Sequence, residues 1–141
     1  MPQFAAKRTL LAPIDDVWAF LAEPYHLADW WPGISGVEPD RRGLAPGARW
    51  KVIGPGTPSL FRKPQMTGTL VVLAVEPMQR IAFQLTGDRI DAELRLHAAE
   101  AKKTEVVLTI EGPFLVGLRR RFPIQALARL HTLLRSGEDD V

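Results

Sequence analysis

The chain has 141 residues, a length typical of one globular domain. Its hydrophobic fraction of 46% and charged fraction of 24% are average for a folded protein and exclude disordered and fibrous classes. The net charge of only +2 disfavours nucleic-acid binding, which usually needs a dense basic surface. The absence of cysteine excludes disulfides, thiolate nucleophiles and cysteine-ligated zinc.

A single domain is expected over residues 1–137, because no repeat, low-complexity tract or linker divides this stretch. The acidic tail at 138–141 is expected to fray. The N-terminus lacks the apolar core of a signal peptide, and the longest apolar run, at 70–75, is too short for a membrane span. These features predict a cytoplasmic protein without a membrane span, and they leave the oligomeric state open.

Residues 4–11 are predicted to form the first strand, which ends at Ala12-Pro13. A helix is predicted to begin at Asp15 and Asp16, because acidic side chains suit the positive end of the helix dipole. It is expected to end at Glu23-Pro24, where proline suits the first turn of a second short helix over 24–31.

Six more strands are predicted, over residues 34–38, 48–53, 66–75, 79–85, 89–97 and 104–111. The clearest pattern is in 89–97, where Ile90, Ala92 and Leu94 face one way and charged residues face the other. Such strict alternation is typical of an antiparallel sheet with one face in water.

The last segment changes to a helical period. Apolar residues recur every three or four positions from Leu115 to Leu134, which predicts one long amphipathic helix. Pro123 lies inside this pattern and removes a backbone hydrogen bond. We therefore expect the helix either to kink or to start afresh at this proline.

The predicted fold class is α+β, with a curved antiparallel sheet of about seven strands around the C-terminal helix. Seven strands spaced at about 4.8 Å make a sheet about 30 Å wide, whereas one helix is only about 10–12 Å across. The sheet must therefore curl around the helix. This shape favours an apolar cavity between the sheet and the C-terminal helix, although a filled core remains the alternative because native interiors close-pack.

Several short segments carry a resemblance to a known family: APIDDVWAFL at 12–21, WWPGI at 30–34, KTEV at 103–106 and the LxxL close of the last helix. In this order they resemble the START-like (SRPBCC) superfamily with the helix-grip fold, and in particular its bacterial polyketide cyclase/dehydrase-like members. The resemblance covers essentially the whole chain and implies binding of hydrophobic ligands in a cavity. Its members include lipid carriers, hormone receptors, cyclases and chaperone- or ribosome-associated proteins, so the resemblance supports the fold more than the activity.

We expect the cavity to be lined by apolar side chains, namely Trp50, Phe83, Leu94, Leu96, Leu108, Leu118 and Phe122. Trp30 or Trp31 is expected near its mouth, because tryptophan can stack on or enclose an apolar ligand. The alternative role for either tryptophan is to anchor the short helices to the sheet.

No strong catalytic constellation is present. The histidines show no metal-ligand spacing, and the sequence lacks both the G-x-S-x-G elbow and a phosphate-binding loop, so no metal and no cofactor are expected. The leading hypothesis is binding or carriage of a small hydrophobic molecule without catalysis. One alternative is an aromatase/cyclase- or dehydratase-like enzyme, with His26, Asp29 or Arg49 assisting proton transfer. The other is a chaperone- or ribosome-associated interaction module that presents the arginine run at 119–121.

Overall fold

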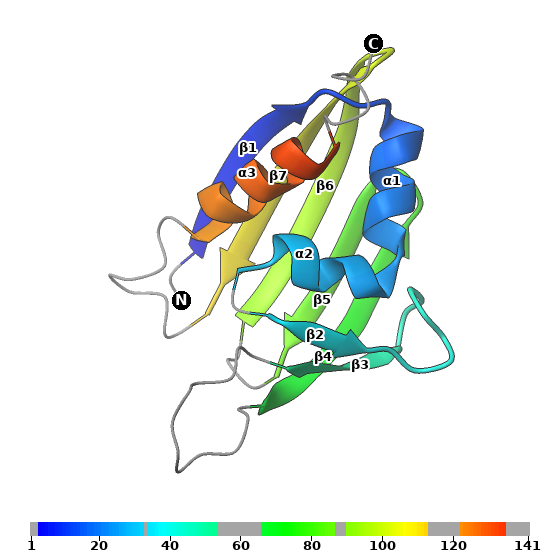
Figure 1. Ribbon diagram of the computed structural model, residues 1–141, viewed down its shortest axis with the longest axis vertical. Helices are drawn as coiled ribbons and strands as arrows, with labels where there is room; N and C mark the ends of the chain where they lie inside the picture. The colour runs from blue at the N-terminus through cyan, green and yellow to red at the C-terminus, as the bar shows by residue number, and fades with distance from the viewer. Residues whose placement is uncertain (1–2, 33, 54–65, 87–89, 113–121, 135–141) are drawn as a thin grey trace.

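The computed structural model describes residues 3–32, 34–53, 66–86, 90–112 and 122–134 (Figure 1). The elements in chain order are β1 (Gln3–Leu10), α1 (Ile14–Ala22), the 3-10 helix η1 (Pro24–His26), α2 (Leu27–Trp30), β2 (Gly36–Glu38), β3 (Arg49–Ile53), β4 (Met66–Glu76), β5 (Arg80–Leu85), β6 (Ile90–Glu100), β7 (Lys103–Glu111) and α3 (Phe122–Leu134). This order confirms the predicted sequence of strand, short helical segments, six strands and C-terminal helix.

The strands form one antiparallel sheet in the order β1-β7-β6-β5-β4-β3-β2. The first strand pairs with the last, and β2 forms the other edge. All the helices lie on one face of this curved sheet, as Figure 1 shows, and α3 packs over β1 and β7. The predicted α+β helix-grip architecture is therefore confirmed.

Strand alternation places the core on the helix-bearing face. In β6 and β7, buried residues face one another across the ladder, with Leu94 opposite Leu108 and Ala92 opposite Ile110. Neighbouring apolar side chains on one face stabilise the pairing and exclude water. The predicted alternation is thus realised as a continuous apolar floor.

The other face of the sheet is polar. The Nε atom of Arg80 donates to Glu93 Oε2 at 2.7 Å, and Arg95 Nε donates to Glu93 Oε1 at 2.9 Å. Burial alone would raise the pKa of Glu93, but the hydrogen bonds and charges of these two arginines outweigh it and lower the pKa. This carboxylate therefore serves an ion-pair network on the side of the sheet away from the helices.

A buried threonine ties the end of β1 to β7. Thr104 is fully buried, and its hydroxyl donates to the carbonyl oxygen of Ala12 at 2.8 Å. Helix α1 follows directly, with Pro13 before its first turn and two aspartates within that turn. Pro13 supplies no side-chain cap, but its carbonyl oxygen accepts from the backbone N–H groups of Asp16 at 3.0 Å and Val17 at 3.1 Å, and the acidic first turn suits the positive end of the helix dipole.

The C-terminal helix α3 is described over Phe122–Leu134. Pro123 is one of the buried residues of this helix. Whether the helix kinks or starts afresh at Pro123 stays a prediction, because the answer depends on the residues before Phe122. The part of the predicted helix before Phe122, and the expected acidic tail at 138–141, lie outside the described residues.

Candidate functional site

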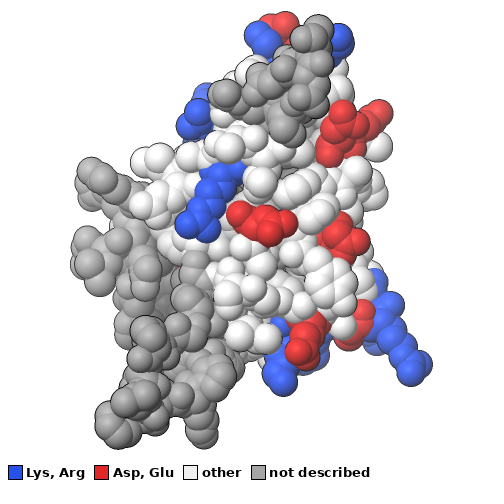
Figure 2. All heavy atoms as spheres, viewed as in Figure 1, with Lys and Arg blue, Asp and Glu red and all other residues white. Residues whose placement is uncertain are grey.

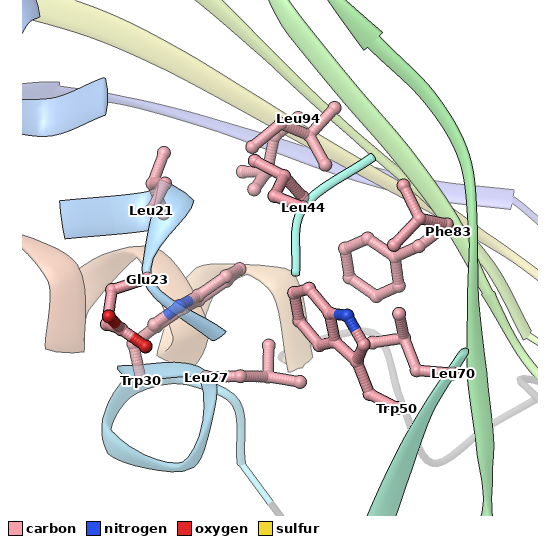
Figure 3. Close-up of a pocket in the computed structure, with 11 residues that line it drawn as sticks. Leu21, Glu23, Leu27, Trp30, Leu44, Trp50, Leu70, Phe83 and Leu94 are labelled. Atoms are coloured by element: carbon pink, nitrogen blue, oxygen red, sulfur yellow. The ribbon is translucent and has the colours of Figure 1, made fainter. Parts of the chain in front are cut away.

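A pocket lies between the sheet and the segment that runs from α1 through α2 (Figure 3). The residues that line it come from both layers and are, with one exception, apolar: Leu21, Glu23, Leu27, Trp30, Leu44, Trp50, Leu70, Val72, Ile81, Phe83 and Leu94. An apolar concavity with few polar groups is the usual form of a small-molecule site. We treat this pocket as the candidate functional site.

The floor of the pocket consists of inward-facing residues on β3, β4, β5 and β6. Strand register brings these residues side by side, with Trp50 opposite Leu70 and Val72 opposite Phe83. Adjacent residues on one face of paired strands have Cβ atoms about 5 Å apart, so their side chains form a continuous surface. The sheet thus supplies a rigid apolar wall.

The opposite wall comes from short helical segments. Leu27 and Trp30 are three positions apart in α2 and therefore share one face of that helix. Glu23 precedes η1, and its Oε2 accepts a hydrogen bond from the backbone N–H of Tyr25 at 3.2 Å. This wall is therefore made of the end of α1, which contributes Leu21, and of the short segments that follow it.

The loop before β3 closes one side of the pocket. The indole N–H of Trp50 donates to the carbonyl oxygen of Gly43 at 2.7 Å, next to the pocket residue Leu44. The Asp40 carboxylate accepts from the backbone N–H groups of Arg42 and Arg49, each at 2.9 Å. The N–H of Arg49 is the largest cause that lowers the pKa of Asp40, and the N–H and charge of Arg42 add to it.

Trp31 occupies the centre of an aromatic cluster beside the pocket. Its ring meets Trp30 at a centroid distance of 5.5 Å, Phe83 at 5.3 Å and Phe122 at 5.0 Å, each nearly edge-on. Such edge-to-face pairs add to the free energy gained from burial alone. Trp31 thereby joins α2 and the first residue of α3 to the sheet.

The hollow itself is small. Its volume is about 20 Å³, enough for about one water molecule. A dry cavity that takes up benzene needs roughly 150 Å³. This pocket, as the described residues form it, is therefore close to the filled-core alternative rather than to a hollow with room for a guest.

The pocket also lies in a different place from the one expected. The cavity was expected between the sheet and the C-terminal helix, yet none of the lining residues belongs to α3. The buried side chains of α3, Ala126, Leu127 and Leu130, pack into the core where the helix crosses β1 and β7. The pocket described here lies under α1 and α2 instead.

The predicted lining residues fall into three groups. Trp30, Trp50, Phe83 and Leu94 line the pocket together. Others are packed outside it, with Leu96 and Leu108 in the sheet core and Trp31 and Phe122 in the aromatic cluster. Leu118, like the arginine run at 119–121, lies outside the described residues.

The structure brings none of the proposed proton-transfer residues into the pocket. His26 stacks on Phe20 with ring centroids 4.1 Å apart, and its Nδ1 lies 2.9 Å from the Phe20 carbonyl oxygen. Asp29 and Arg49 are exposed. The titratable residue that does line the pocket is Glu23, whose place at the end of a helix marked it in the sequence only as part of a stop signal.

Charged side chains are scattered on the helix-bearing face. Figure 2 shows isolated blue and red groups among white ones, with no patch of one sign over the residues described there. Within the described ranges, no three His, Asp or Glu side chains gather closely enough to hold a metal ion. Among the described helices, none has the length and apolar character needed to cross a bilayer.

Solved structures share this fold across nearly the whole chain. A protein from Nitrosospira multiformis superposes with a TM-score of 0.74 at 15% identity, covering 98% of this chain and 99% of its own. A Deinococcus radiodurans protein gives 0.66 at 23% identity, covering 99% and 100%. DynU16, from the dynemicin biosynthetic locus, gives 0.66 at 20% identity, covering 96% of this chain and 48% of its own. At these identities the likeness concerns the fold alone.

A search of curated proteins found no match. A family model described as "Polyketide cyclase / dehydrase and lipid transport" matches residues 1–133 and so spans almost the whole chain. The order of elements, the single curved sheet and the C-terminal helix agree with that match. The chain therefore belongs to the polyketide cyclase/dehydrase and lipid transport family.

Proposed function

We propose that the protein binds or carries a small hydrophobic molecule in the pocket between the α1–α2 segment and the sheet. The observation that carries this proposal is the composition of the pocket wall, in which Glu23 is the single charged residue among apolar and aromatic side chains. Burying apolar surface contributes roughly 25 cal/mol per Å², which favours an apolar guest over a polar one. Membership of a family whose description includes lipid transport supports the same function.

Binding on this proposal widens the pocket, because about 20 Å³ is too small for a guest of several carbons. The floor is held by the hydrogen bonds of four paired strands and stays in place. The other wall moves more easily, since α2 is a single turn and Leu44 lies in a loop. The free energy needed to displace these segments lowers the affinity, so we expect modest binding.

The enzymatic alternative, a cyclase or dehydratase, would have to use Glu23 as its proton-transfer group. Removal of water from a substrate needs one group that takes a proton and one that gives a proton to the leaving hydroxyl. The lining residues include one titratable group, the carboxylate of Glu23. Binding without catalysis therefore fits the wall of this pocket better.

The test is a titration with N-phenyl-1-naphthylamine, an uncharged probe whose fluorescence rises in apolar surroundings. The variant Val72→Phe fills the pocket from its floor, and Leu73→Phe is its matched control, because Leu73 is 51% exposed on the same strand. We expect the wild type and Leu73→Phe to bind the probe alike and Val72→Phe to bind at least about tenfold more weakly. Leu44→Trp fills the pocket from the loop if Val72→Phe does not fold. Absence of probe binding in the wild type, or equal binding by the folded filled variants, would overturn the proposal.

A further inference from the structure

Two polar groups accompany the apolar wall of the pocket: the carboxylate of Glu23 and the indole N–H of Trp30. Glu23 is exposed, which places its carboxylate at the mouth. Its Oε2 accepts from the Tyr25 N–H, so its other oxygen has no role in capping η1. The pocket thus presents a charged hydrogen-bond acceptor at the boundary with water.

Trp30 differs from Trp50 in the state of its indole N–H. Trp50 donates to the carbonyl of Gly43, whereas the N–H of Trp30 has no acceptor in the part of the chain that the structure describes. Trp30 is only 3% exposed, and a tryptophan so deeply buried normally pairs its N–H. Among the described residues, every side-chain nitrogen or oxygen that is fully buried has a hydrogen-bond partner. An N–H without an acceptor therefore cannot be fully buried. The N–H of Trp30 thus keeps some contact with open space, and Trp30 is one of the residues that line the pocket.

In Figure 3 the Glu23 carboxylate and the Trp30 indole both lie on the helical side of the pocket, across from Phe83 and Leu70 of the sheet. A carboxylate only accepts hydrogen bonds, and an indole N–H only donates. An ammonium group could donate to Glu23 but has no lone pair for Trp30. A ligand carboxylate could accept from Trp30 but would be repelled by Glu23. A hydroxyl donates and accepts at once, and it is close to the size of the single water that about 20 Å³ can hold.

We infer that the ligand is an apolar alcohol or phenol whose hydroxyl lies at the mouth of the pocket, donating to Glu23 and accepting from Trp30. This inference rests on the proposed function, since it names the chemical class of the guest for the same pocket. The apolar body of the molecule contacts the floor of the sheet. The hydroxyl replaces the hydrogen bonds that these two groups would otherwise make with water.

The experiment compares benzyl alcohol with toluene, which has the same ring and lacks the hydroxyl. Dissociation constants are measured from chemical-shift changes of the full chain, for the wild type and for Glu23→Ala, Trp30→Phe and the control Glu38→Ala. Glu38 is exposed on β2 and does not line the pocket. We expect Glu23→Ala to weaken the binding of benzyl alcohol about tenfold and to leave the binding of toluene unchanged, because hydrogen bonds to charged groups are among the stronger ones. Trp30→Phe should shift the ratio of the two dissociation constants, benzyl alcohol to toluene, in the same direction. Glu38→Ala should leave this ratio unchanged.

The outcomes separate this inference from the proposed function. If neither compound binds the wild type, the proposed function fails. If both bind and neither Glu23→Ala nor Trp30→Phe changes the ratio, the binding function stands and the hydroxyl inference is overturned. Benzylamine and benzoate serve as charged analogues, and tighter binding of either than of benzyl alcohol would also overturn it. Because Glu23 is exposed, its alanine variant keeps the test valid even if Trp30→Phe does not fold.

Discussion

The ring of Trp31 meets the ring of Phe122 at 63°, with their centroids 5.0 Å apart. This contact joins the end of α2 to the first residue of α3, two segments that lie some ninety positions apart in the chain. The same tryptophan also touches the sheet through Phe83. The helical layer is thereby held to the sheet at one aromatic point beside the pocket.

Trp31→Ala is expected to lower the free energy of unfolding by about 3–5 kcal/mol, because a large buried aromatic leaves a cavity when truncated. Trp31 is 2% exposed and loses three ring contacts at once. Urea denaturation followed by far-UV circular dichroism measures this change. Tyr25→Ala is the control, since Tyr25 is 63% exposed and should change stability by less than about 0.5 kcal/mol. Similar effects of the two variants would contradict the role given to Trp31.

Thr104→Val keeps the shape of the side chain and removes its hydroxyl. The carbonyl of Ala12 then loses its buried donor, and we expect a loss of about 1–3 kcal/mol in the free energy of unfolding. Thr109→Val is a matched control on the same strand, because Thr109 is half-buried on the opposite face. Thermal or chemical denaturation that finds Thr104→Val as stable as Thr109→Val would show that the bond to Ala12 contributes nothing.

Trp50→Phe retains an aromatic ring in the pocket but removes the N–H that binds Gly43. We expect a loss of about 1–3 kcal/mol and faster hydrogen exchange at the amide of Arg49, which Asp40 holds in the same loop. Trp18→Phe, at a half-buried position of α1, provides the comparison. Unchanged exchange at Arg49 would mean that the indole does not hold the loop.

Acid should remove the contribution that the ionised Asp40 carboxylate makes to the stability of the fold. Because the folded state holds the pKa of this carboxyl below its usual value of 3.8, the ionised group stabilises the fold above that pH. The contribution is lost as the pH falls through the lowered pKa. The stability difference between wild type and Asp40→Ala should therefore be constant near neutral pH and shrink as the pH falls below about 4. Urea titrations across this range measure it, and a difference that does not depend on pH would be evidence against the two backbone hydrogen bonds.

Much of the fold could be predicted because strand alternation and helical period depend on neighbours in the chain. Trp50, Phe83 and Leu94 were expected to face inward, and they do line one pocket. Alternation tells which face a residue occupies, but not which helix covers that point of the sheet. Leu96 and Leu108 face the same way and yet lie outside the pocket.

The helical wall of the pocket could not be predicted from strand alternation or helical period. Trp30 and Trp31 are adjacent, and only the packing of α2 decides that the first lines the pocket while the second enters the aromatic cluster. Glu23 was interpreted as part of a helix stop, because a single charged residue at a helix end carries no sign of the cavity beside it. Leu44 belongs to a loop whose position depends on the Asp40 and Trp50 hydrogen bonds.

The pairing of β1 with β7 sets a condition on how the chain is made. Gln3 lies opposite Glu111, so β1 is synthesised more than a hundred residues before its ladder partner β7. Closing so long a loop is slow relative to local pairing. During synthesis, strands β2 to β7 can pair with their neighbours in the chain as they emerge, whereas β1 has no ladder partner until β7 has been made.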